Sequence, residues 1–165
     1  YWPIFATAVD KRFGTEKELH ELLATAHSHN MNVVLDYVAN HMHINSPTLQ
    51  ENPTWHTDSI LPDGRRNFEL WDEARLTTWF DVHIPTLDLE REEVCGPMTD
   101  SALYWLENFE FDGFRHDACK HIPLNYWREL GRKMKQRFPN RHIWMIGEPA
   151  MISVISNWKT PLKRN

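Results

Sequence analysis

The sequence predicts an α/β fold in which short parallel strands alternate with helices. Three segments with apolar residues at helical spacing are each followed by a short apolar run of strand length. Such alternation is typical of a parallel sheet, because successive parallel strands need a crossover connection between them. One long polar stretch after the first strand interrupts the pattern. The sequence therefore favours a parallel sheet carrying one insertion.

The first helix is expected within residues 14–30. Thr15 is a candidate N-cap, and Glu18 follows three residues later, which is the pattern of a capping box. The run at 31–40 is rich in β-branched residues and predicts a strand that is apolar on both faces. The apolar face of the helix would be formed by Leu19, Leu22, Leu23 and Ala26.

The periodic pattern breaks down from His41 to about Asp81. Asn, Pro, Asp, Thr and Gly dominate this stretch, with tryptophans between them. A structureless loop of that length is improbable inside a compact domain. We therefore expect a small irregular subdomain inserted after the first strand.

Two further helix–strand pairs follow the insertion. Residues 98–110 predict a helix and 109–117 a strand, and residues 122–138 and 141–148 repeat the pair. Pro123 is expected in the first turn of the last helix. The apolar lines of the two helices would be Met98, Ala102, Leu106 and Phe109, and Leu124, Trp127, Leu130, Met134 and Phe138.

Each predicted strand ends in polar residues. Function in parallel α/β folds lies at the carboxyl ends of the strands. Taken singly, each carboxylate could instead cap a helix or form a salt bridge. An ionised group in a core is costly unless it is paired, so three such strand ends favour a chemical role. The first strand ends in Asp36, followed by Asn40 and His41. The second ends in Arg115 and Asp117, followed by Lys120 and His121, and the third ends in Glu148.

The positions of these charges suggest that one carboxylate is ionised and another is protonated. Arg115 and Asp117 are two residues apart and face the same side, so Arg115 could pair with Asp36 and lower the pKa of Asp117. A carboxylate kept ionised suits a nucleophile. Glu148 follows an apolar run, where partial desolvation would favour the protonated form of a general acid. This pairing is typical of glycoside hydrolysis, and retention requires carboxyl groups about 5–5.5 Å apart.

Several motifs resemble the α-amylase family, glycoside hydrolase family 13. They occur in the family's order and read DYVANH at 36–41, GFRHDACKH at 113–121 and GEP at 147–149. Residues 84–90, IPTLDLE, resemble a short motif at the end of the family's inserted domain, and residues 1–15 resemble the loop before its second barrel helix.

This resemblance implies a partial (β/α)8 TIM barrel holding the equivalents of strands 3–5, with an irregular subdomain inserted after strand 3. Residues 1–41 would form helix 2 and strand 3, residues 42–88 the B-type insertion, and residues 89–165 helix 3 to the start of helix 5. A whole barrel needs roughly 250 residues, so we expect this chain to be a fragment that is inactive in isolation.

The resemblance also implies a retaining glycoside hydrolase that acts on α-glucosidic bonds of α-glucans through a covalent intermediate. Asp117 would be the nucleophile, Glu148 the general acid/base, and Arg115 the group that orients Asp117. Substrate-binding residues would be His41, Lys120, His121 and Asp36, the last of which braces Arg115. A structural calcium ion in many members would be held by Asn40, Asp88 and the backbone carbonyl of His121.

Other interpretations stay open at this point. One is a transglycosylase or isomerase of the same family, and another is a non-catalytic carbohydrate-binding relative. Phe5 and Ala6 stand where many members have Asp-Tyr, which bears on specificity. A zinc site is a further alternative, because histidines two apart on a strand can chelate this ion. Its ligands would come from His41, His43, His116 and His121.

The composition limits which classes of binding partner the protein can have. The formal net charge of -5 argues against a nucleic-acid partner, because phosphate binding depends on clustered Lys and Arg. No apolar run approaches the roughly 18 residues of a membrane span. The eight tryptophans either pack the core or line a groove for a sugar ring. Cys95 and Cys119 lack a metal-type spacing, and the compartment stays open.

Overall fold

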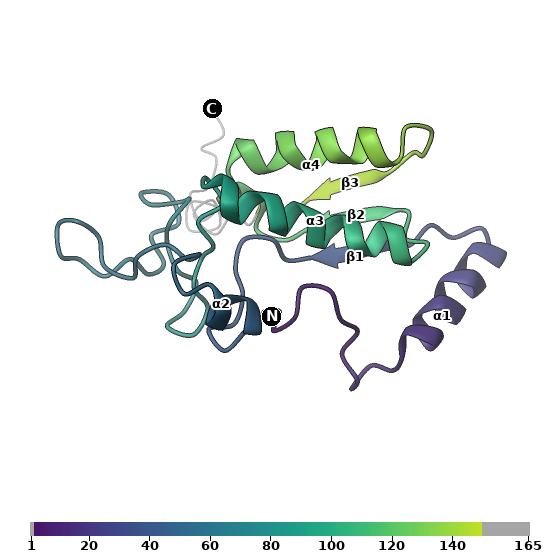
Figure 1. The fold of residues 1–165 in the computed structure, drawn as a ribbon, viewed down its shortest axis with the longest axis horizontal. Helices are drawn as coiled ribbons and strands as arrows, with labels where there is room; N and C mark the ends of the chain where they lie inside the picture. Colours follow the sequence, from purple (N-terminus) through teal and green to yellow (C-terminus); the bar gives the residue numbers. More distant parts are fainter. Residues whose placement is uncertain (1, 150–165) are drawn as a thin grey trace, which may run out of the picture.

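A computed structural model describes residues 2–149, so the predicted start of a further helix beyond them lies outside the described residues. Three parallel strands form one sheet in the order β1-β2-β3, which confirms the predicted parallel sheet (Figure 1). The strands span Val34–Tyr37 (β1), Gly113–His116 (β2) and Trp144–Gly147 (β3).

Two long helices cover the sheet and supply much of the core. In Figure 1, α3 lies in front of the strands and α4 above them, and the two helices pack against each other. Their buried side chains, such as Leu103 and Tyr126, form one cluster with Phe114 of β2. The helices span Glu16–Ser28 (α1), Pro47–Glu51 (α2), Glu92–Asn108 (α3) and Leu124–Arg137 (α4), with a 3-10 turn at Cys119–His121 (η1).

The predicted capping box is present at the start of α1. The Glu18 backbone N–H donates to Thr15 Oγ1 at 3.2 Å, and the Thr15 N–H donates to Glu18 Oε2 at 2.8 Å. The predicted apolar face is only partly correct, because Leu23 and Ala26 are buried while Leu22 is 55% exposed. Figure 1 shows the reason: α1 lies beyond one end of the sheet rather than flat against it.

The later helices differ from their predicted limits. α3 begins at Glu92, six residues before Met98, where the predicted segment starts. Its first turn is acidic, which favours a helix N-terminus, and Pro97 inside the helix removes one backbone donor without ending it. Pro123 is the N-cap of α4 rather than a first-turn residue, and Leu124, predicted on the apolar line, is 60% exposed.

The polar stretch after β1 folds without regular sheet. Apart from the short α2, isolated bridges such as His41 to Thr86 and Phe68 to Trp79 tie it together. Trp79 is buried there, and its Nε1 donates to the carbonyl of Thr57 at 3.0 Å. In Figure 1 the arrowheads of β1 and β3 point toward this stretch. The insertion therefore lies at the carboxyl ends of the strands.

Candidate active site at the carboxyl ends of the strands

One guanidinium joins the three predicted carboxylates. Arg115 Nη1 lies 2.7 Å from Asp36 Oδ1 and 3.2 Å from Asp117 Oδ1, and Arg115 Nη2 lies 3.8 Å from Glu148 Oε2. Each carboxylate lies on or just after a different strand, so the parallel sheet gathers them at one edge. The predicted pairing of Arg115 with Asp36 is confirmed.

The expected direction of the Asp117 pKa is wrong. Burial raises the pKa of the Asp117 carboxyl, and the charges of Glu148 and Asp36 raise it further, while Arg115 opposes them. The side chain is only 14% exposed, and its guanidinium partner is shared with two other carboxylates. One shared positive charge therefore does not offset desolvation together with two negative neighbours.

Glu148 is more exposed than its apolar approach suggested. β3 is an outer strand of the described sheet, and the Glu148 side chain is 38% exposed, so the preceding apolar run does not desolvate it as expected. Its backbone is nevertheless fixed. The Glu148 N–H donates to the carbonyl of His116 at 2.9 Å, and its carbonyl accepts from the Cys119 N–H at 3.0 Å. These bonds hold Glu148 against the end of β2.

A sharp reversal follows Asp117. The Asp117 N–H donates to the carbonyl of Tyr37 at 3.1 Å, which extends the pairing with β1. Ala118 then takes a left-handed conformation with φ of 49° and starts the turn η1. Non-glycine residues adopt this region at a cost, and such strain clusters at functional sites. Sequence reasoning missed this feature because alanine, unlike Gly or Asn, gives no signal of it.

The insertion reaches over η1 and holds both of its predicted site residues. The Lys120 ammonium forms an ion pair with Asp72, and Arg75 Nη1 donates to the Lys120 carbonyl at 2.5 Å. His121 Nδ1 lies 2.7 Å from the Arg75 carbonyl. Since a carbonyl only accepts, Nδ1 carries the proton in this bond. Burial lowers the pKa of His121, which favours the neutral ring with Nε2 as its acceptor nitrogen.

Aromatic rings bring the two predicted substrate histidines together. The ring of Phe80 contacts the rings of both His41 and His121, with centroids 4.6 Å and 5.2 Å away. Trp71 packs edge-on against Phe80 at 4.8 Å and against His121 at 5.7 Å. Trp71 and Phe80 were not predicted at the site, and the only signal for them was the presence of aromatic residues in a polar stretch.

Asn40, one of the expected calcium ligands, has a side-chain oxygen without a hydrogen-bond partner among the described residues. Asn40 is fully buried. The Leu87 N–H donates to the Asn40 carbonyl at 2.9 Å, which brings the following residue, Asp88, close to Asn40. A buried amide oxygen without a hydrogen-bond partner fits a hard cation such as calcium, which prefers oxygen ligands.

The alternative zinc site is not formed. In the described part of the chain, no three His, Cys, Asp or Glu side chains gather where they could hold a metal ion. His43 instead contacts the rings of Trp2 and His83, and His116 packs among aromatic rings.

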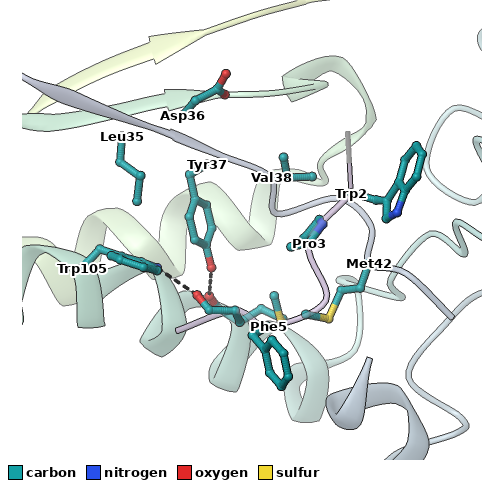
Figure 2. A pocket seen from close by; sticks show the side chains of 11 residues that line it. Trp2, Pro3, Phe5, Leu35, Asp36, Tyr37, Val38, Met42 and Trp105 are labelled. Carbon is teal, nitrogen blue, oxygen red and sulfur yellow. Dashed lines mark hydrogen bonds between the residues drawn. The ribbon is translucent and has the colours of Figure 1, made fainter. Parts of the chain in front are cut away.

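An apolar cavity of about 220 Å³ lies on the other face of β1. Figure 2 shows Leu35 and Tyr37 pointing into it, whereas Asp36 points to the opposite side of the strand. This alternation is that of any β-strand, and it turns the Asp36 carboxylate away from the cavity. Phe5 and Ala6 line the cavity, and the Ala6 carbonyl accepts from Trp105 Nε1 at 2.8 Å.

Comparison with known proteins identifies the family. The model of the α-amylase catalytic domain matches residues 1–165. The chain belongs to the α-amylase family. This confirms the resemblance seen in the motifs.

Individual relatives agree with this membership. The chain is 30% identical to a maltogenic α-amylase of Bacillus acidopullulyticus, over 85% of this chain and 24% of that protein. It is 32% identical to a 1,4-α-glucan branching enzyme of Aromatoleum aromaticum, over 81% of this chain and 20% of that protein. The chain thus spans about a quarter or less of the length of these curated relatives.

A solved structure supports the fold. The crystal structure of the α-amylase of Geobacillus thermoleovorans, complexed with acarbose, superposes with a TM-score of 0.74 at 30% identity. The match covers 89% of this chain and 32% of that one. Within residues 2–149, no helix combines the length and apolar character needed to cross a membrane.

Proposed function

We propose that the complete natural protein carrying this sequence is a retaining glycoside hydrolase acting on α-glucosidic bonds of α-glucans such as starch and maltooligosaccharides. The observation that carries this proposal is the contact of a single guanidinium, that of Arg115, with carboxylates from three neighbouring strands. Packing alone does not require such a cluster, because each charge placed there loses hydration.

In the proposed mechanism, Asp117 attacks the anomeric carbon and forms a covalent glycosyl-enzyme intermediate. Glu148 protonates the departing oxygen and then, as the base, activates water for the second step. Arg115 orients Asp117, and Asp36 braces Arg115 from β1 through the 2.7 Å contact. The half-exposed position of Glu148 gives it access to the leaving group and to water.

The substrate would be bound by His41, Lys120 and His121. His41 and His121 both contact the ring of Phe80, and Lys120 lies in the same turn as His121. We further propose that a structural calcium ion is held by Asn40, Asp88 and the backbone carbonyl of His121. The orphaned Oδ1 of Asn40 supports this ligand set, and the ion would join the insertion to the turn after β2.

We also propose how the chain maps onto a (β/α)8 barrel. β1, β2 and β3 would correspond to strands 3, 4 and 5, with residues 1–41 and 89–165 as barrel segments and 42–88 as the inserted subdomain. The parallel order β1-β2-β3 and the position of the insertion after β1 support this assignment.

The test is activity of the complete protein on a nitrophenyl α-maltooligoside and on starch. Asp117→Asn should lower kcat by more than about 1000-fold, and Glu148→Gln by about 100-fold or more. Asp63→Asn is the matched control, because Asp63 is also paired with an arginine but lies in the insertion. Retention is tested by the anomer of the first-formed product and by a glycosyl adduct on the Asp117 peptide. Equal rates for Asp117→Asn and the control would refute the assignment.

A second candidate is a transglycosylase of the same family. The 32% identity to a branching enzyme supports this second candidate. In a transglycosylase, a sugar hydroxyl instead of water would attack the same covalent intermediate. The ratio of transfer products to reducing ends released from maltooligosaccharides distinguishes the two. A non-catalytic carbohydrate-binding role would instead show as binding of maltooligosaccharides without turnover.

A further inference from the structure

Lys120 is held by a segment far from it in sequence. Asp72 contributes the carboxylate of an ion pair with the Lys120 ammonium, and Arg75 binds the Lys120 carbonyl. The Arg75 carbonyl in turn accepts from His121 Nδ1 at 2.7 Å. The insertion therefore fixes both the backbone of this turn and the direction of the lysine side chain.

The two members of the ion pair differ in exposure. The Lys120 side chain is 24% exposed, whereas the Asp72 side chain is 63% exposed. Exposed ion pairs add little to stability, so the pair is poorly explained as a structural device. A lysine side chain has a flexible stem whose ordering on ligand binding is costly. An acidic partner that holds it beforehand lowers that cost.

We propose that Asp72 is a positioning residue that pre-orients Lys120 for sugar binding on the leaving-group side of the site. This inference rests on the proposed function, because it takes Lys120 to contact the substrate. Asp72 acts through Lys120 and touches no reacting atom. Its loss should therefore weaken substrate binding and leave the chemical step intact.

The size of the effect follows from the ordering of one long side chain. Holding one such side chain changes binding by about 2- to 10-fold. We expect Asp72→Asn to raise KM for a maltooligosaccharide by this factor while kcat changes by less than about 2-fold. The neighbouring acid provides a matched control: Glu73 is similarly exposed, at 56%, and pairs with Arg65 rather than with Lys120. Glu73→Gln should leave KM unchanged.

The experiment measures kcat and KM of the complete protein for wild type, Asp72→Asn, Glu73→Gln, Lys120→Met and the Asp72→Asn/Lys120→Met double variant. If Asp72 acts through Lys120, Asp72→Asn raises KM in the wild type but adds nothing to Lys120→Met. Asp72→Glu should restore part of the affinity, and melting temperatures should match between Asp72→Asn and Glu73→Gln.

Three results would overturn the inference. They are equal KM values for Asp72→Asn and Glu73→Gln, a fall in kcat at unchanged KM, or a full Asp72→Asn effect that persists beside Lys120→Met. A wild-type protein that releases no sugar from α-glucans would overturn the proposed function, and this inference with it. An active wild type with any of the three results overturns only the role of Asp72.

Discussion

His116 is a buried titratable group between Arg115 and Asp117, on the opposite face of β2 from the carboxylates. It is 1% exposed, and neither ring nitrogen has a hydrogen-bond partner among the described residues. Its ring is surrounded by aromatic residues, with Trp127 at 4.8 Å and Tyr37 at 5.8 Å between centroids. Burial lowers the pKa of His116 to about 4, against a weak opposing effect of the Asp36 charge.

This pKa makes the fold sensitive to acid. The unfolded chain binds a proton at His116 near pH 6.5, whereas the folded protein resists it down to about pH 4. Stability from the neutral ring is therefore fully present above about pH 6.5 and is lost as the pH falls toward 4. At about 1.4 kcal/mol per pH unit, the loss amounts to about 3 kcal/mol. That is a large part of the roughly 5–15 kcal/mol of a typical domain.

The test replaces His116 by leucine, which fills similar space and does not titrate. Free energies of unfolding of the complete protein are measured in urea at about pH 7.5 and about pH 4.5. His116→Leu should be as stable as wild type or more stable at the higher pH, because two unpaired buried nitrogens are removed. On acidification it should lose about 2–3 kcal/mol less than wild type.

The exposed His142 supplies the control for this experiment. His142→Gln removes an exposed histidine and tests whether the loss of any histidine, rather than of the buried one, alters the pH dependence. Parallel curves for wild type and His116→Leu would refute the reasoning, because they would mean that His116 titrates alike in the folded and unfolded states.

Three other outcomes follow from contacts in the structure. Gly113→Ala should lower the free energy of unfolding by about 3 kcal/mol or more, because a Cβ there would overlap the backbone of β3. Gly131→Ala in α4 has open space around the new methyl group and should raise the free energy of unfolding by about 0.5–1 kcal/mol. Urea unfolding measures both changes. Thr15→Ala removes the capping box and should cost about 1 kcal/mol, measured in the same way. If calcium binds as proposed, a chelator should lower the melting temperature of wild type but not of Asn40→Ala, and an equal fall in both would contradict that site.

Local patterns predicted most of the regular elements. The capping box at Thr15 and the apolar runs before Asp36 and Glu148 depend on near neighbours, so the sequence displays them directly. The start of α3 was missed because its first turns carry an acidic pair and Pro97 instead of a clear apolar period. Exposure was misjudged at Leu22, since the packing partner of a helix face depends on where the helix lies.

The sequence predicted the contacts at the site that follow from the order of the strands. It did not predict the contacts that the insertion makes with the site. Parallel strands place their carboxyl ends together, so the meeting of Asp36 with Arg115 could be expected. The contact of Lys120 with Asp72 joins residues 48 apart, across a stretch with no regular pattern. No local rule specifies such a contact, and the same holds for the packing of Trp71 on His121.

The charges around Arg115 explain why the pKa of Asp117 is raised, whereas the sequence predicted that it would be lowered. The sequence indicates an arginine two residues away that also pairs with Asp36, but not that Glu148 shares this arginine or that Asp117 is buried. A carboxyl whose folded pKa is raised contributes stability below its unfolded pKa, and this is lost as the pH rises through the folded value. The ionised form that the proposed nucleophilic attack requires is therefore held at a cost to the fold at neutral pH. Asp117→Asn should then raise the melting temperature at neutral pH while abolishing turnover, and a lower melting temperature would show that the pairing with Arg115 outweighs desolvation.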